Sequence, residues 1–479
     1  MVFSNISQDV LQKLRSTCFA TLAVVVAGMS APAARADTLA DALVSAYANS
    51  GLLVQNRALL RAADEDVAAA GAALEPVLRW TASITQNLNR GRNSALLGVP
   101  NSDSLLASGS LIAELLLYDG GATALGIDVA KETVLATRQS LIGIEQQVLL
   151  RGVQAYMGVI EATEFVQLRQ NNVRVLTQEL RAAQNRFEVG EVTRTDVALA
   201  EAQLAEARSG LATAQGNLAI SVEEYRNIIG RSPGRLSPPP RLPSLDGNID
   251  AAKALAVRVH PDLRAVQYRV SAAELAIRRA EAAKRPTVAL QGALSMSDDF
   301  GSSNFSTGAR IGINAGGTIY QGGARSSLVR AAQARRDAER GNLHVVRNNI
   351  QQNVGNAYAQ LSSARASIVA SEQQIRAARI AFNGVREEAT LGARTTLEVL
   401  DAEQALLDAE AARISAQTLV YNAAYAVLAA TGRLTARDLR LPVQFYDVNE
   451  YYNLVKDSPT KRSEQGAQLD RVLKSLQKE

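Results

Sequence analysis

The chain contains an internal repeat, and this repeat constrains the fold more than any other feature of the sequence. The stretch LYDGGA at 117–122 returns as IYQGGA at 319–324, which pairs Tyr118 with Tyr320 at a shift of 202 residues. The same shift aligns VGEVTRTDVALAEAQ (189–203) with LGARTTLEVLDAEQA (391–405) without a gap. Upstream, Pro76 pairs with Pro286 at a shift of 210 residues. A register that holds this far indicates a duplication, so we expect one structural plan to be used twice.

Each copy is expected to contain a helix, a β-hairpin and two long helices joined by a glycine turn. The first repeat is placed at 37–230 and the second at 250–436, with a linker at 231–249 whose prolines cannot continue a helix. The tail at 437–479 is expected to be equatorial or partly disordered. The predicted hairpins and long helices are 76–118, 122–187 and 193–229 in the first copy, and 286–320, 324–389 and 395–431 in the second.

The long helical segments carry an apolar repeat of seven residues. Alanine recurs at 200, 207 and 214, and again at 402, 409, 416, 423 and 430, beside a second sevenfold series of larger residues. Sevenfold repetition produces a left-handed coiled-coil seam, and alanine lets the backbones approach closely. Two seams on one helix imply a neighbour on each side, which suits a closed ring of helices as well as a simple pair. An aromatic content of only 4% fits this packing better than a globular core.

The predicted strands alternate between apolar and polar residues. In 76–88, Leu78, Trp80 and Ile84 fall on one face, and Thr81 and Ser83 fall on the other. The other three strands show the same pattern, which matches barrel strands with lipid outside and a lumen inside. A soluble sandwich with one solvated face remains the alternative for any single strand. Four strands cannot close a barrel, and an open edge in lipid leaves backbone groups unpaired, so we expect three chains to supply twelve strands.

The N-terminus has the features of a secretory signal peptide over residues 1–36. Lys13 and Arg15 provide a basic start, CFATLAVVVAGMS is a short apolar run, and Ala34-Arg35-Ala36 resembles a cleavage site. Cys18 is the only cysteine, so the mature chain is expected to have no disulfide and no thiol chemistry. Its RSTC context does not match the box that precedes a lipidated cysteine, so no lipid anchor is expected.

Charge and composition argue against several functions. Removing residues 1–36 lowers the formal charge from +4 to +2, which is too small an excess to indicate nucleic-acid binding. With two histidines in all, a histidine metal site or a His-based hydrolase is not expected, and no cofactor is predicted. The sequence has no GxxxxGK[ST] loop and no catalytic dyad with an orienting third group, so we do not expect an enzyme.

With these features established, the sequence resembles the outer-membrane efflux protein family of the TolC type. The resemblance is carried by the duplicated plan and by the paired motifs, and it covers the chain from about 38 to 435. The motifs are RFEVGEVTRTDVALAEAQLAEA (186–207), LGARTTLEVLDAEQALLDAE (391–410), HPDLRAVQYRVSAAELAIRRAEAAKRP (260–286) and the two Tyr-x-Gly-Gly corners.

The resemblance implies a fold, a location and partners. It implies a mixed α and β membrane protein in which a homotrimer completes a twelve-stranded barrel in outer-membrane lipid. A tunnel of long antiparallel coiled-coil helices would lie in the periplasm. The expected partners are a periplasmic adaptor and an inner-membrane ABC or proton-driven transporter. The expected function is a passive exit duct for proteins in type I secretion, for small toxic compounds, or for both. A periplasmic adaptor or coiled-coil scaffold without a membrane barrel remains the alternative.

The resemblance also places a periplasmic gate at the tips of the long helices. The matching positions are Thr195 and Asp196 in the first copy, with Arg394, Glu398 and Asp401 in the second. Glu398 and Asp401 are three residues apart and share one helix face, so threefold symmetry would bring six carboxylates to a constriction that attracts cations. We expect Arg394 to bridge to Asp196 of a neighbouring hairpin. The family often has a tyrosine five residues before this arginine, and Ala389 stands there instead.

The two Tyr-x-Gly-Gly motifs are interpreted as corners where a barrel strand ends and a tunnel helix begins. The tyrosines would close their strands near the membrane interface, where aromatic residues are favoured. The glycines would let the backbone turn with a positive φ, a role that is commoner than a phosphate-binding loop. The corner residues are Tyr118, Gly120, Gly121, Tyr320, Gly322 and Gly323.

Overall fold

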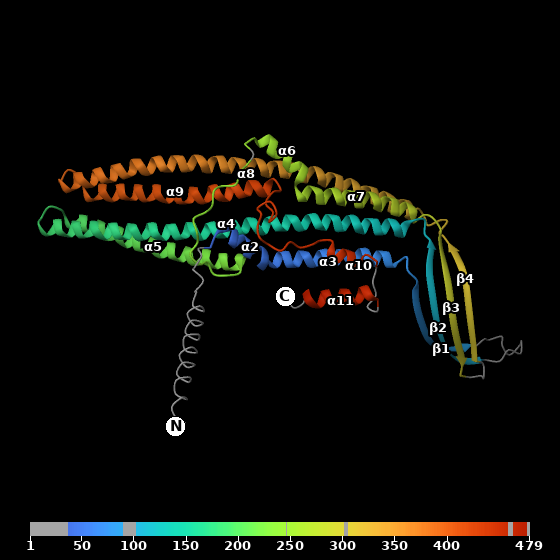
Figure 1. Ribbon diagram of the computed structural model, residues 1–479. Helices are drawn as coiled ribbons and strands as arrows, with labels where there is room; N and C mark the ends of the chain where they lie inside the picture. The colour runs from blue at the N-terminus through green and yellow to red at the C-terminus, as the bar shows by residue number, and fades with distance from the viewer. Residues whose placement is uncertain (1–36, 90–101, 246, 301–304, 458–462, 477–479) are drawn as a thin grey trace, which may run out of the picture. The chain divides into compact units, whose positions relative to one another are not determined.

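The computed structural model describes residues 37–89, 102–245, 247–300, 305–457 and 463–476 (Figure 1). The predicted signal peptide at 1–36, with Cys18, lies outside these residues. The chain divides into two compact units, and each is described by itself. The first unit contains residues up to Ala46, Gly152–Leu242 and Ile375–Ile414. The second contains Tyr47–Arg151, Pro243–Gln374 and the described residues from Ser415 onward.

The secondary structure repeats in the order that the duplication predicts, except that two helices, where one was expected, precede each hairpin. The long helices α4 and α8 have 67 residues each, which corresponds to roughly 100 Å at 1.5 Å per residue. The first series is α2 (Leu39–Asn49), α3 (Gly51–Ala72), β1 (Val77–Asn89), β2 (Ser102–Tyr118), α4 (Ala122–Glu188) and α5 (Arg194–Ile229). The second is α6 (Ile249–Val259), α7 (Pro261–Ala282), β3 (Thr287–Asp299), β4 (Phe305–Gly316), α8 (Ala324–Thr390) and α9 (Thr396–Ala430). No helix in the described part of the chain is long and apolar enough to cross a membrane.

Backbone geometry repeats with the sequence. Among the described residues, the glycines with positive φ form four pairs, each separated by the shift of 202: 120 and 322, 121 and 323, 190 and 392, and 230 and 432. A positive φ is a conformation that residues with a Cβ adopt at a cost. The duplication therefore preserves the turns of the fold as well as its sequence pattern.

The four strands form one antiparallel sheet in the order β1-β2-β3-β4 (Figure 1). Val77 faces Glu114 in the first hairpin and Thr287 faces Gly316 in the second. Thr287 is Val77 shifted by 210 residues and Gly316 is Glu114 shifted by 202, so the two hairpins pair their strands in equivalent registers. The apolar face is exposed, with Trp80 75% and Ile311 79% accessible. These side chains cover the face that the alternation predicts to contact lipid.

The opposite face of the sheet is polar and is crossed by hydroxyl pairs. The hydroxyl oxygens of Thr81 and Ser110 are 2.7 Å apart, and those of Ser83 and Ser108 are 2.9 Å apart. Ser297 and Ser306 make a similar contact in the second hairpin at 2.7 Å. Thus the two faces of the sheet differ in polarity as predicted.

The two corners are not alike in a single chain. Tyr118 is the last residue of β2, and Gly120 and Gly121 follow it with φ of 71° and 86°. In the second copy β4 ends at Gly316, so the prediction that Tyr320 closes a strand is wrong for the isolated chain. The reason is pairing: β3 begins at Thr287, directly opposite Gly316, and β4 has no further strand on its outer edge.

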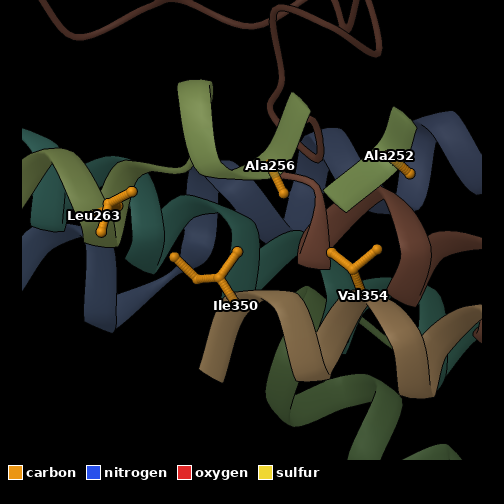
Figure 2. Packing of buried hydrophobic residues seen from close by; sticks show 5 residues of the cluster. All are labelled: Ala252, Ala256, Leu263, Ile350 and Val354. Carbon is orange, nitrogen blue, oxygen red and sulfur yellow. The ribbon is translucent and has the colours of Figure 1, made fainter. Parts of the chain in front are cut away.

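Most of the sevenfold alanine positions are buried, as expected for close helix packing, and Ala402 and Ala430 are partly buried. Ala200, Ala207 and Ala214 are at most 7% exposed, and Ala409 is fully buried. In the second unit, Ala252 and Ala256 of α6 face Ile350 and Val354 of α8, as Figure 2 shows. Small side chains on one helix thus accommodate branched ones on the other.

The C-terminal tail forms two helices in the second unit. α10 (Glu450–Val455) packs on α3, where Tyr451 and Val455 bury Ala68. The hydroxyl of Tyr451 donates a hydrogen bond to Glu65 at 2.6 Å. α11 (Glu464–Leu476) follows. The sequence alone indicated no anchor for this tail.

Candidate functional site

The candidate gate lies at two hairpin turns of the first unit, between α4 and α5 and between α8 and α9. Gly190 and Gly392 adopt φ of 80° and 76° at these turns. The following amides bond back to the helix that ends, from Glu191 to the carbonyl of Arg186 at 2.9 Å and from Ala393 to that of Glu388 at 2.9 Å. Both tips therefore share one backbone geometry.

Two of the three carboxylates predicted for the gate, Asp196 and Glu398, cap the returning helices. The Thr193 amide donates to Asp196 at 2.9 Å, and the Asp196 amide donates to the Thr193 hydroxyl at 3.3 Å. Thr395 and Glu398 repeat this reciprocal pair at 2.8 and 3.3 Å. Such a capping box satisfies amides at a helix N-terminus, where negative charge is favoured. The pattern Thr-x-x-Asp/Glu before each apolar repeat could have revealed both boxes from the sequence.

The capping bonds lower the pKa of both carboxyl groups. For Asp196, the hydrogen bonds from the Thr193 hydroxyl and amide lower the pKa. For Glu398, the backbone amide of Thr395 contributes most, followed by the Arg394 guanidinium, and the pKa is again lowered. Both groups thus carry their charge at neutral pH.

Arg394 lies between two acidic side chains of its own hairpin. Its Nε donates to Glu388 at 2.8 Å and its Nη1 donates to Glu398 at 2.9 Å. These contacts, with Glu388 first, raise the pKa of the guanidinium. Within the single chain Arg394 does not contact Asp196, because Glu398 is only four residues away and Asp196 already accepts from Thr193. In this chain Arg394 therefore binds two acidic side chains of one tip, and its bridge to Asp196 of a neighbouring copy stays a prediction.

The remaining candidates are exposed on the two tips. Asp401 is solvent-exposed one turn after Glu398, on the same face of α9. Thr195 is exposed at the start of α5. The structure therefore groups Arg394, Glu398 and Asp401 on the second tip and Thr195 with Asp196 on the first.

The contacts between the hairpins involve residues that the gate prediction did not include. Arg186 donates to the carbonyl of Ala389 at 3.4 Å, and Ala389 is buried against Phe382 and Val399. Arg386 and Glu179 form an ion pair at 3.0 Å. The position where the family often has tyrosine is thus filled by a buried alanine whose backbone still connects the hairpins.

A buried carboxyl lies deeper between the same helices. Glu403 is 6% exposed and accepts a hydrogen bond from the Asn172 amide at 2.9 Å. Burial, the largest cause, raises its pKa to about 7, and Glu179 adds to this while Asn172 and Arg386 oppose it. Sequence reasoning paired Glu403 with Glu201 as part of the repeat and gave it no further role, since periodicity alone does not separate a buried carboxyl from an exposed one. In the described residues, no group of three or more His, Cys, Asp or Glu side chains is arranged to hold a metal.

Long coiled-coil hairpins, together with a sheet that exposes one apolar face, define an outer-membrane channel subunit. The comparisons with known proteins agree with this class. The family model described as "Outer membrane efflux protein" matches residues 42–231 and 254–433. The chain belongs to this family.

Individual relatives support the assignment over most of the chain. The chain is 35% identical to the outer membrane efflux protein BepC of Brucella suis over 91% of this chain and 94% of that protein. It is 26% identical to the outer membrane protein TolC of Escherichia coli over 65% of this chain and 68% of that protein. A solved structure of CusC superimposes with a TM-score of 0.72 at 18% identity, over 83% of this chain and 92% of that one.

These findings establish the general function. The protein is an outer-membrane exit duct of tripartite export systems, with its helical tunnel in the periplasm. The predicted fold class, with four strands per chain beside a helical tunnel, is confirmed. The family assignment favours the exit duct over the alternative of an adaptor without a membrane barrel. Members of the family are trimeric channels that work with inner-membrane transporters and adaptors.

Proposed function

We propose that three copies of this chain close a barrel by pairing β4 of one copy with β1 of the next. One observation carries this proposal: the shifts of 210 and 202 carry the β1·β2 register onto that of β3·β4. The duplication then makes the β2·β3 pairing inside one chain the template for β4·β1 pairing between chains. Closure also supplies partners for backbone groups that lipid cannot satisfy.

The template gives specific residue pairs. Adding 202 to a β2 residue gives its equivalent in β4, and subtracting 210 from a β3 residue gives its equivalent in β1. Ile112 faces Ala293 within the chain, so Asn314 of one copy is expected to face Ser83 of the next. Tyr118 faces Val288, so Tyr320 is expected to face Leu78 of the next copy. On this account residues 317–320 become part of a strand only in the trimer, where they gain a neighbour.

The corner glycines support the same template. A Cβ on Gly120 would lie 2.7 Å from the Arg285 side chain, which also donates to the Gly120 carbonyl at 3.2 Å. Gly322, its equivalent, has no atom within 4 Å of such a Cβ. We infer that Gly322 receives the segment before β1 of the next copy, as Gly120 receives the segment before β3.

Paired cysteines test the closure directly. Ser83→Cys combined with Asn314→Cys is expected to give a covalent trimer on oxidation, because facing strand residues lie within disulfide range. Within one chain these strands are three spacings apart, about 14 Å, which is too far for a disulfide. The control pairs Ser83→Cys with Ser306→Cys, which lies roughly 27 Å along β4 from Asn314. Cross-linking of the control alone, or a product no larger than a dimer, would contradict the register.

We propose that the hairpin tips form the periplasmic gate, with Thr195, Asp196, Arg394, Glu398 and Asp401 at the constriction. Support comes from the two ionised capping carboxylates and from the exposed Asp401 beside them. In a trimer these acids would gather around one axis and attract cations. Arg394 would moderate this field by pairing with Glu388 and Glu398.

We propose that the duct is passive and that its partners supply the energy. The partners would be a periplasmic adaptor and an inner-membrane transporter of the ABC or proton-driven type. The name of BepC refers to efflux, and this favours small toxic compounds as cargo, with secreted proteins as the second candidate. Copurification of the tagged protein with its inner-membrane partner would decide, since a drug transporter and a type I secretion ATPase differ in sequence.

A further inference from the structure

The polar face of the sheet carries few charges, and they are unevenly placed. Strand pairing puts the charged side chains of four described strand residues on this face: Arg79, Glu114, Asp299 and Arg310. Arg79 and Arg310 belong to one transverse row, which runs from β1 to β4 through Ile112 and Ala293. Both edges of the sheet thus carry an arginine on the face that is expected to line the lumen.

Only one of these two arginines has an acidic partner. Arg79 and Glu114 approach to 3.9 Å. Arg310 is exposed and makes no ion pair within the described residues. Glu114 lies two strands away from it and two residues along, about 12 Å at the usual strand geometry. Asp299 is six residues along β3 from the partner of Arg310, roughly 20 Å away.

Closure of the barrel adds no acid beside Arg310. Ser108 faces Ser297 within the chain, so the same template places Asn87 of the next copy opposite Arg310. An asparagine can accept a hydrogen bond from a guanidinium but cannot neutralise its charge. The positive charge of Arg310 therefore remains uncompensated in the trimer.

We propose that the three copies of Arg310 form a cationic tier in the barrel lumen, which favours the passage of anions and of cargo bearing carboxylate or phosphate groups. This inference rests on the proposed trimer. Twelve strands about 4.8 Å apart give a circumference of about 58 Å and a radius of at least about 9 Å. The Debye length at physiological ionic strength is about 8 Å, so the field of the tier extends across most of the lumen. Arginine rings select anions in other pores by the same physics.

Planar bilayers with a KCl gradient across them provide the test. The wild-type trimer and Arg310→Gln are compared by their reversal potentials, with SDS-resistant trimers confirming assembly of each. We expect R310Q to lower the Cl⁻/K⁺ permeability ratio and R310E to lower it further. The difference should shrink at 1 M salt, where the Debye length falls to about 3 Å.

A matched control uses the compensated pair. The double variant R79Q/E114Q removes one charge of each sign and is expected to leave the permeability ratio unchanged. Normal conductance with the same reversal potential in R310Q as in the wild type would overturn the tier alone. A wild-type protein that forms no SDS-resistant trimer would overturn the proposed closure, and the tier with it.

Discussion

The two hairpin tips of the first unit have the same backbone and different chemistry. Both contain a glycine with positive φ followed by a capping box, at Gly190 and Thr193 in the first copy and at Gly392 and Thr395 in the second. At the shift of 202, however, Val192 corresponds to Arg394 and Leu199 corresponds to Asp401. Glu201 is exposed, whereas its equivalent Glu403 is buried.

This difference separates the residues that build the tip from those that give it a function. The glycine and the threonine are required by the turn and by the helix N-terminus, so both copies keep them. A charge at the neighbouring surface positions is not required by the turn. Arg394 and Asp401 are therefore charged in the second copy, whereas their equivalents Val192 and Leu199 are apolar in the first. Substitutions at the shared residues and at the differing ones are expected to change stability by different amounts.

The largest effect is expected from Glu403 and its dependence on pH. Its folded pKa of about 7 lies above the ordinary value of 4.5, so folding retains the proton. The contribution of this group to the free energy of unfolding is fully present below pH 4.5 and is lost as pH rises through 7. The loss is about 3 kcal/mol, because one pKa unit corresponds to about 1.4 kcal/mol. Glu403→Gln should therefore flatten the fall in stability between pH 5 and pH 8, measured by thermal loss of the helical circular dichroism signal.

The matched control is Glu201→Gln on the first copy. Because Glu201 is exposed, this change should leave the pH dependence as it is in the wild type. Equal slopes for E403Q and the wild type would mean that Glu403 does not titrate as its burial indicates.

A smaller effect is expected at the shared glycines. Gly190→Ala and Gly392→Ala place a Cβ on a left-handed residue, which costs roughly 1–2 kcal/mol at each turn. Gly384→Ala is the control, since this glycine lies inside α8 with no atom near the added Cβ and no positive φ. It should stabilise α8 by about 0.5–1 kcal/mol. Denaturation midpoints measure all three, and a stabilising G392A would contradict the turn geometry.

The smallest effect is expected at the capping threonines. Thr193→Ala and Thr395→Ala each remove the hydroxyl that accepts from the third residue of the helix, at a typical cost of about 1 kcal/mol. Hydrogen exchange of the amides at Asp196 and Glu398 should accelerate in the matching variant only. Faster exchange at both tips in either variant would show that the boxes do not act locally.

The sequence was sufficient to predict the strands and the long helices, because the repeat allowed each predicted element to be checked against its copy. The ends of α4, α5, α8 and α9 lie within one residue of the predicted ranges, since glycine turns and a sevenfold pattern determine them. β4 ends at Gly316, before Tyr320, because the end of this strand depends on a neighbouring strand that its own chain does not supply. This information is absent from the local pattern.

The candidate site was less accessible to sequence reasoning. The residue types at the tips could be named, but the partners of Arg394 depend on which side chains the turn brings within reach. The burial of Glu403 depends on packing between two hairpins, and its hydrogen-bond partner Asn172 is 231 residues away in the sequence. Neither relation follows from spacing along one helix.

The central claim is that the charges of the second tip lie on the conduction pathway, and the signs of two variants test it. Asp401→Asn removes a negative charge, and Arg394→Gln removes the positive charge that pairs with Glu388 and Glu398. In planar bilayers with a KCl gradient, D401N should shift the reversal potential away from K⁺ selectivity and R394Q should shift it toward K⁺ selectivity. Opposite shifts would support the gate, whereas no shift in either variant, or shifts of the same sign, would contradict it.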